Sequence, residues 1–244
     1  MATLTSIVLS AGCIRDVAGI DGAFYDGDGR KVHCAVNLDQ SARAMATVDG
    51  ALDRARDRGE IVELYAHEPG DTIDLADIEH VLAGARDRGL AFVTYADMAA
   101  RREMRPGLAL SFDDNFVEPW HTMRPLLQQY GARVTFFISR YANMSPVNKQ
   151  RVRDLADDGH EIAAHTVLHL RAPTYVEEHG LAAYMADEAL PSIEVLRGDG
   201  YDVTSFAYPY GARTSELDDA LLAHVSLLRS VSFSVEGVPD PCPR

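Results

Sequence analysis

The sequence predicts an α/β protein whose parallel strands form a closed or nearly closed barrel. Short apolar runs alternate with segments of helical periodicity through most of the 244 residues, which is typical of repeated β/α units. About seven such units can be counted, close to the number in (β/α) barrels. A chain of this length can bury a substantial core in one domain. We therefore expect residues 1–244 to form a single distorted barrel of about seven or eight β/α units.

The alternation is most regular from residue 108 onward. Predicted strands cover residues 108–112, 134–138, 161–164, 205–210 and 227–233, and predicted helices cover residues 120–130, 146–158, 176–197 and 214–224. Gly131 and Gly159 follow two of these helices, where a C-terminal cap favours glycine. This part of the chain therefore reads as a continuous series of β/α units.

Residues 1–100 show the same alternation. Predicted strands cover residues 22–25, 31–38, 61–66 and 90–95, and predicted helices cover residues 41–58 and 75–88. The first two strands flank Asp26-Gly27-Asp28-Gly29, which is typical of a β-hairpin turn. A calcium loop is the alternative, but the remaining ligand positions of such a loop are missing. We predict a hairpin here.

Composition argues against several partners. The chain has 37 acidic and 23 basic residues, which give a formal net charge of −14. Nucleic acids and anionic membranes bind basic surfaces, so we expect neither as a partner. We also expect no membrane span, because no run of about 18 apolar residues is present. Without a clear signal peptide we expect a cytoplasmic chain as written, or an extracytoplasmic one if a leader was removed.

The three cysteines, Cys13, Cys34 and Cys242, form no recognisable pattern. They are too few and too scattered for a disulfide framework or a CxxC metal site. We expect three free or buried thiols. Nothing in the sequence indicates the oligomeric state.

Two polar segments at the ends of neighbouring predicted strands favour a metal site. One is Ser111-Phe112-Asp113-Asp114, and the other runs from His165 to His169. Histidines four residues apart lie on one face of a helical turn, so both imidazoles can reach one ion. A carboxylate from the other strand end completes a three-ligand set and leaves a position open for water or substrate. The second Asp can then take a proton from the attacking water.

Each segment also has an interpretation without metal. A lone histidine pair is common on surfaces and in cores, and Asp-Asp after a strand often caps a helix. Both segments lie at predicted C-terminal strand ends, where barrels place their active sites, so we favour the metal site. No Gly-x-Ser-x-Gly sequence supports a catalytic serine. The histidines without a partner at ligand spacing are His80, His121, His160, His179 and His224.

Residues 108–233 resemble the NodB-homology domain of the polysaccharide deacetylases, carbohydrate esterase family 4. Ser111-Phe112-Asp113-Asp114 matches the family's first motif, T/S-F-D-D, and residues 165–169 match the second, H-S/T-x-x-H. Residues 132–137 and 159–162 are also typical of the family. The resemblance implies that Asp113 is the general base. It further implies a divalent metal, usually zinc and sometimes cobalt or nickel, bound by Asp114, His165 and His169.

The third family motif, R-x-P-Y/F, is incomplete. Pro209 and Tyr210 match it, but Ala207 replaces the arginine that orients the catalytic Asp in the family. By resemblance, the Tyr210 backbone N–H stabilises the oxyanion. The missing arginine leaves open how Asp113 is tuned: another side chain substitutes, or the substrate differs from an acetylated sugar. A simple Pro-Tyr-Gly turn is the alternative to a catalytic role.

The family's last motif, L-x-H, occurs before the first motif, as Leu64-Tyr65-Ala66-His67. Residues 32–39 resemble the strand that normally carries the fourth motif's Asp, here Asp39. We therefore hypothesise a circular permutation in which residues 1–98 hold the customary final third and residues 108–233 hold the first three motifs. The end strands of a barrel are neighbours, so its termini can be joined and the chain reopened elsewhere. The alternative is that residues 1–100 form unrelated packing units and His67 is a surface histidine.

These residues predict a metal-dependent hydrolase that cleaves a C–N amide bond, most simply by de-N-acetylation of an N-acetylated sugar polymer or oligomer. Asp113 would activate water, and His67 would protonate the departing amine, with Asp39 raising the pKa of His67. Pro209 and Trp120 are further candidates for tuning or substrate contact, although core or helix packing is the favoured role of Trp120.

Two other functions remain open. Ala207 favours hydrolysis of a small cyclic amide or ureide on the same fold. A non-catalytic carbohydrate-binding relative is the third possibility, although such a protein has no need for a base beside an open metal site.

Overall fold

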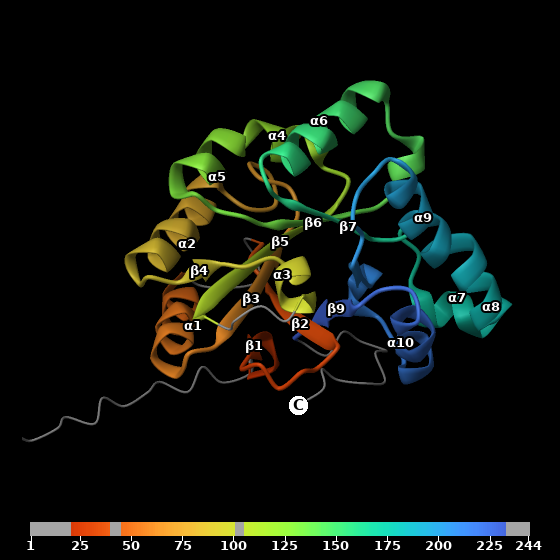
Figure 1. Cartoon of the computed structure of the whole chain (residues 1–244), viewed down its shortest axis with the longest axis horizontal. Helices are drawn as coiled ribbons and strands as arrows, with labels where there is room; N and C mark the ends of the chain where they lie inside the picture. Colours follow the sequence, from red (N-terminus) through yellow and green to blue (C-terminus); the bar gives the residue numbers. More distant parts are fainter. Residues whose placement is uncertain (1–20, 40–44, 101–104, 233–244) are drawn as a thin grey trace, which may run out of the picture.

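The computed structural model describes residues 21–39, 45–100 and 105–232, and its parallel strands form a closed barrel surrounded by helices (Figure 1). The pairing of β3 with β5 and of β2 with β9 completes the ring. The predicted barrel is therefore confirmed. The barrel strands, in the order in which they pair, are β2 (Val32–Asn37), β3 (Ile61–Ala66), β5 (Gly107–Asp114), β6 (Thr135–Ile138), β7 (Glu161–Ala164), β8 (Ser205–Ala207) and β9 (Leu227–Val231).

Two short strands fill gaps in the ring. β1 (Phe24–Tyr25) pairs antiparallel with the start of β3, and β4 (Ala91–Phe92) pairs parallel with the start of β5. The predicted hairpin between β1 and β2 is therefore wrong, although Gly27 and Gly29 form a turn with positive φ. β2 instead lies between β3 and β9, because closing the barrel requires it there.

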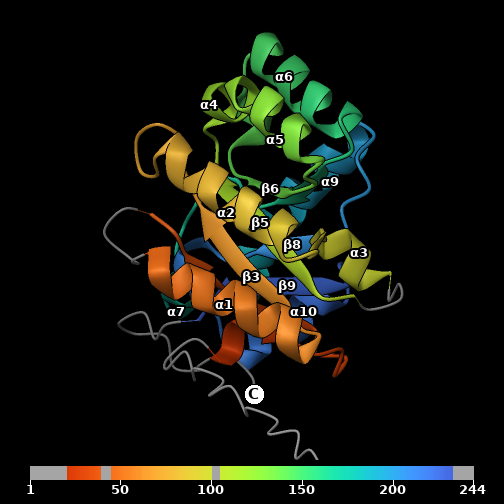
Figure 2. The ribbon, with the colours of Figure 1, turned by 90° about the vertical axis from the view of Figure 1, so that its left-hand side faces the viewer.

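Helices connect the strands and cover the outside of the barrel (Figure 2). Several begin at a side-chain cap, as at Thr94, Ser145 and Thr214, whose hydroxyls accept a backbone N–H of the first turn. The helices are α1 (Met45–Arg58), α2 (Leu75–Asp87), α3 (Tyr95–Ala99), α4 (Val117–Thr122), α5 (Arg124–Tyr130), α6 (Pro146–Asp157), α7 (Ala172–His179), α8 (Leu181–Tyr184), α9 (Leu190–Gly198) and α10 (Ser215–Leu222). A π-helical segment, Met185–Ala189, joins α8 to α9 without a break.

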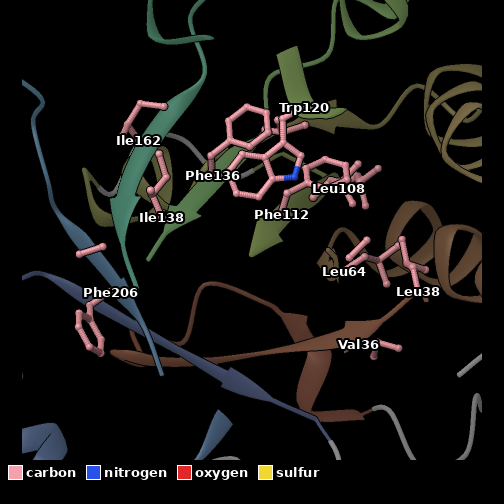
Figure 3. Packing of buried hydrophobic residues seen from close by; sticks show 14 of the residues in the cluster. Val36, Leu38, Leu64, Leu108, Phe112, Trp120, Phe136, Ile138, Ile162 and Phe206 are labelled. Atoms are coloured by element: carbon pink, nitrogen blue, oxygen red, sulfur yellow. The ribbon is translucent and has the colours of Figure 1, made fainter. Parts of the chain in front are cut away.

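Alternate residues of each strand face different environments, as the pleat of a strand requires. On β5, Leu108 and Phe112 belong to the large core cluster between barrel and helices, together with Trp120 and Phe136 (Figure 3). Ala109 belongs instead to a smaller cluster, whose other members include Phe137, Ala163 and Ala207. The sheet thus packs one face against the helices and encloses the other.

The strand positions that face the enclosed interior also carry buried polar side chains. His33 Nδ1 lies 2.9 Å from Glu63 Oε1, and both residues are almost completely buried. Ser205 donates a hydrogen bond of 2.6 Å to Glu161. Buried polar groups are costly unless they are paired, so these contacts offset the cost of placing polar side chains inside the barrel.

Cys34 on β2 is buried and disulfide-bonded. The prediction of a free thiol is therefore wrong at this position, because spacing along the chain does not report which cysteines meet after folding. Cys13 and Cys242 lie outside the described residues. Within the described part of the chain, no helix is long and apolar enough to cross a membrane.

Candidate active site

The predicted site residues gather at the C-terminal ends of the barrel strands. Asp113 and Asp114 end β5, His165 follows β7, and His67 follows β3. Because β3 pairs with β5, with Ala66 opposite Phe112, His67 is next to the two aspartates in the ring. This end of the strands is where β/α barrels place functional side chains.

Asp114, His165 and His169 converge on one point. Each offers one ligand atom, and the three atoms lie within 4.8 Å of one another. Asp114 Oδ1 lies 3.0 Å from His169 Nε2 and 3.6 Å from His165 Nε2. One carboxylate oxygen and two imidazole nitrogens are donors suited to a divalent cation.

The protonation of these residues supports such a ligand set. Burial lowers the pKa of His165 to about 3, so its imidazole is neutral. Its Nδ1 lies 2.8 Å from the Ala207 carbonyl oxygen and must carry the proton, which leaves the Nε2 lone pair facing Asp114. Burial likewise lowers the pKa of His169.

The buried oxygen of Asp114 fits a cation better than a hydrogen bond. Asp114 Oδ1 has no hydrogen-bond partner among the described residues, although two imidazole nitrogens are close. A carboxylate lone pair facing a neutral imidazole lone pair is unfavourable unless a positive charge lies between them. The three residues therefore fit a divalent metal ion.

The backbone around this cluster is strained. Among the described residues, the non-glycine positions with positive φ are Asp114, Thr166, His169, Tyr210 and Arg140. A β-branched residue such as Thr166 rarely adopts this conformation. Here the Thr166 hydroxyl accepts the His169 backbone N–H at 2.9 Å and bridges the turn between the two histidines. Such strain is characteristic of functional sites.

Arg229 on β9 pairs with Asp113, and the sequence interpretation missed it. Its Nη2 donates a hydrogen bond to Asp113 Oδ2, and both side chains are almost fully buried. The guanidinium carbon lies 4.8 Å from the Tyr65 ring centroid and 5.0 Å from that of Phe137. Arg229 thus places a guanidinium beside Asp113. Ala207, which stands at the arginine position of the third motif, has no side chain that could do so. An arginine in the middle of the apolar strand Leu227–Val231 was the available signal.

This pair keeps Asp113 ionised. Burial by itself would raise the pKa of Asp113, but the positive charge of Arg229, which also donates a hydrogen bond to the carboxylate, lowers it overall. Arg229 occupies one carboxylate oxygen. The other, Oδ1, is buried and has no hydrogen-bond partner within the described residues. Asp113 therefore presents one unengaged basic oxygen beside the cluster of ligands.

His67 is held by Asp39 and Trp120. Its Nδ1 lies 2.5 Å from Asp39 Oδ2, and the Thr72 hydroxyl donates to Asp39 Oδ1 at 2.9 Å. Burial lowers the pKa of His67, but the hydrogen bond to Asp39 and the charges of Asp113, Asp39 and Asp114 raise it overall. His67 is therefore suited to carry a proton.

Trp120 does not line a sugar subsite. The side chain is fully buried under α4, and its Nε1–H donates to the His67 carbonyl oxygen at 2.8 Å. The candidate role of Trp120 in substrate contact is therefore wrong, and the favoured role, core packing, is confirmed by the contact of its ring with Phe136. Its contact with the site runs through the backbone of His67.

Pro209 and Tyr210 form a tight turn beside His169. Pro209 is buried, whereas the Tyr210 side chain is 54% exposed, with its ring centroid 4.8 Å from that of His169. The following residue, Gly211, has a φ of +64°, and a Cβ there would lie 2.5 Å from Val231 Cγ2. Only glycine fits this close approach of the turn to β9.

Several solved structures share this fold. IcaB from Ammonifex degensii superposes with a TM-score of 0.58 at 20% identity, covering 70% of this chain and 83% of that one. A de-N-acetylase from Aggregatibacter actinomycetemcomitans gives 0.54 at 19% identity, covering 69% and 86%. The BpsB deacetylase domain from Bordetella bronchiseptica gives 0.50 at 15% identity, covering 86% and 96%.

Sequence comparisons extend this likeness. A gellan lyase from a Bacillus species is 33% identical over 147 residues, which are 59% of this chain but only 5% of that protein. Residues 101–224 match the family model for polysaccharide deacetylase. This match covers more than half of the chain and contains Asp113, Asp114, His165 and His169. The chain therefore belongs to the polysaccharide deacetylase family, on a NodB-like α/β barrel.

Proposed function

We propose that this protein is a divalent-metal-dependent de-N-acetylase that acts on an N-acetylated sugar polymer or oligomer. The observation that carries the proposal is the convergence of Asp114, His165 and His169 beside the Asp113–Arg229 pair. Two histidines and a carboxylate are a frequent ligand set of catalytic zinc, so zinc is the proposed metal, with cobalt or nickel as alternatives.

The mechanism assigns one step to each residue around the metal ligands. A divalent cation, when bound, polarises a carbonyl oxygen and lowers the pKa of water. Asp113 Oδ1 takes the proton of the water that attacks the acetyl carbon, while Arg229 holds the other oxygen of Asp113. The Tyr210 backbone N–H donates to the developing oxyanion. Protonated His67 then donates to the amide nitrogen as the C–N bond breaks, so that the amine leaves neutral.

The choice of a sugar substrate rests on the family and on Cys34. Polysaccharide deacetylases act on acetylated glycans, and Arg229 removes the argument that Ala207 made for a small cyclic amide. Disulfides persist mainly in oxidising compartments, where bacterial polysaccharides are found. The disulfide at Cys34 therefore supports an extracytoplasmic location.

We also propose that residues 1–244 form one circularly permuted catalytic domain. Its support is the order of strands: the chain runs β2, β3, β5, β6, β7, β8 and β9 around the ring, and β9 then meets β2. A ring has no obligatory first strand, so the same barrel can begin at β5 and end at β3. His67, from the early part of the chain, then occupies the place of the family's last motif.

Metal analysis combined with acetate release from chitooligosaccharides tests the function. We expect one equivalent of zinc and acetate release that is lost after chelation and restored by added zinc. Asp113→Asn should lose turnover and keep the metal, whereas His165→Ala should lose both. Metal binding with release from a cyclic ureide alone would move the substrate to small amides. Glycan binding without any hydrolysis would indicate a carbohydrate-binding protein.

A further inference from the structure

The loop between the two metal-binding histidines is held mainly by polar contacts. The Arg140 backbone N–H donates to the Thr166 carbonyl oxygen at 3.3 Å, and Arg140 Nη2 donates to the Leu168 carbonyl oxygen at 3.2 Å. The Leu168 side chain is 47% exposed, so it packs little against the core. The backbone nevertheless adopts positive φ at both Thr166 and His169. Strained conformations persist only where surrounding groups hold them. The groups that hold residues 166–169 therefore determine whether His165 and His169 face the same point.

Glu188 holds this loop from the protein interior. Its carboxylate Oε2 accepts the Leu168 backbone N–H at 2.9 Å, and its backbone carbonyl oxygen accepts the Val167 N–H at 3.2 Å. Glu188 is 1% exposed. A single buried residue thus binds two consecutive N–H groups of the loop, both between the two histidines.

The π-helical segment explains how one residue presents both acceptors. Leu190 N–H bonds to the Met185 carbonyl five residues earlier, which is the pattern of a π turn. The next residue, Pro191, has no N–H to donate, which favours local widening of the helix. In a widened turn a carbonyl can tilt away from the helix axis, and the Glu188 carbonyl oxygen accepts the Val167 N–H. π turns of this kind are frequent at functional sites.

We propose that Glu188 is a positioning residue for the metal site. Its carboxylate and carbonyl hold the turn between His165 and His169 in the shape that brings both Nε2 atoms to Asp114. The proposal rests on the proposed function, because it concerns the same metal ligands. Glu188 itself touches neither the ligand atoms nor, in the mechanism above, the substrate. Substitution of a residue that orients metal ligands in this way commonly lowers metal affinity by about 10–100-fold.

Three variants separate positioning from general stability. Glu188→Ala removes the side-chain acceptor and keeps the backbone one, whereas Glu188→Gln keeps an oxygen that can accept the Leu168 N–H. Ser192→Ala is the matched control, since Ser192 is buried on the same helix and donates only to the Ala189 carbonyl, at 2.7 Å. Each full-length variant is measured for zinc affinity by chelator competition, and for amide hydrogen exchange in the metal-free state.

We expect Glu188→Ala to weaken zinc binding by about 10–100-fold, and Glu188→Gln to stay within about threefold of the parent. In the metal-free protein, Glu188→Ala should speed exchange of the Val167 and Leu168 amides. Ser192→Ala should leave both quantities unchanged. Unchanged affinity and exchange in Glu188→Ala would overturn the proposal, as would equal losses in Glu188→Gln or Ser192→Ala. If the parent protein binds no zinc, the proposed function fails, while exchange at residues 167 and 168 still decides the role of Glu188.

Discussion

At the scale of single residues, the contact between Arg229 and Asp113 joins positions 116 residues apart in the chain. Family sequence patterns place the arginine four residues before Gly211, where this chain has Ala207. Here the barrel brings in the same chemical group from a neighbouring strand, since β8 and β9 pair with Ala207 opposite Arg229. A guanidinium beside the base is thus maintained although its position in the sequence has changed.

Replacing Arg229 by methionine should impair the base. Met has a similar length but no charge, so the main group that opposes the effect of burial on Asp113 is lost and the pKa of Asp113 rises. The base must be ionised to act, so activity falls as Asp113 becomes protonated. With a raised pKa, this loss in the variant should begin at a higher pH than in the parent protein. We expect acetate release to drop by about 10²–10⁴-fold near neutral pH. The pH dependence of kcat/KM checks this, and an unchanged acidic limb would contradict the role of Arg229.

Replacing Asp39 by asparagine should move the basic limb of the pH profile, where activity falls as the pH rises. The hydrogen bond to Asp39 raises the pKa of His67 against the effect of burial, so its loss lowers that pKa. A proton donor with a lower pKa is deprotonated earlier as the pH rises. The basic limb of kcat should therefore move to lower pH, with zinc content unchanged. If the limb stays in place, His67 is not the proton donor.

At the scale of elements, close approaches of the backbone shape the site as much as side chains do. The turn Pro209–Gly211 lies against β9, and Gly211 is the residue that permits it. The π-helical segment similarly lies against the loop of residues 166–169. In both places a helical turn departs from regular geometry where it meets the site. Periodicity predicted one helix over residues 176–197, and the π-helical segment within it could not be read from that pattern.

Gly211→Ala should be much more damaging than a glycine substitution elsewhere. The added Cβ would lie 2.5 Å from Val231 Cγ2 and 2.9 Å from Val231 N, so β9 must shift. We expect a loss of about 2–4 kcal/mol in the free energy of unfolding. Gly89→Ala is the control, because Gly89 has a similar φ of +69° and a Cβ added there would meet no atom within 4 Å. Denaturant titration of both variants measures the difference, and equal losses would show that φ strain alone matters.

At the scale of the whole molecule, closure of the barrel buries paired polar side chains among apolar ones in its interior. His33 on β2 and Glu63 on β3 meet there, and Arg229 lies opposite His33 on the neighbouring strand. Each of these side chains would be costly to bury alone. Their pairing links the strands at the point where the early and late parts of the chain join.

His33→Leu should destabilise the barrel strongly. The substitution leaves Glu63, which is fully buried, without its imidazole partner. We expect a loss of about 3–5 kcal/mol in the free energy of unfolding. The double variant His33→Leu, Glu63→Leu should recover most of this loss, because no unpaired buried polar side chain remains. A double-mutant cycle by chemical denaturation measures the coupling, and additive losses would contradict it.

A rearranged chain tests the permutation directly. Joining the present ends and opening the chain between residues 100 and 105 would start the barrel at β5, the order usual in the family. Since the strand pairings are unchanged, we expect the rearranged protein to fold, bind zinc and release acetate. A protein that folds but binds no metal would argue against the permuted relationship.

Much of this fold and site follows from local sequence. The alternation of apolar runs and helical segments was sufficient to predict the barrel, and Asp113, Asp114, His165 and His169 stand out because motif spacing is a property of neighbouring residues. Asp39 and His67 followed from resemblance. Packing of Trp120 in the core was the favoured interpretation, although an aromatic side chain near a site can face either the core or solvent.

The remaining features exist only once the strands have met. Arg229 reaches Asp113, Glu188 reaches the loop of residues 166–169, and His33 reaches Glu63 across separations of 116, 20 and 30 residues. No local pattern encodes such contacts, since they depend on which strands and helices become neighbours and on which face each side chain occupies. Short-range spacing thus identifies the proposed metal ligands and the proposed base, Asp113. Closure of the barrel supplies the arginine that pairs with Asp113 and the buried acceptors around the loop of residues 166–169.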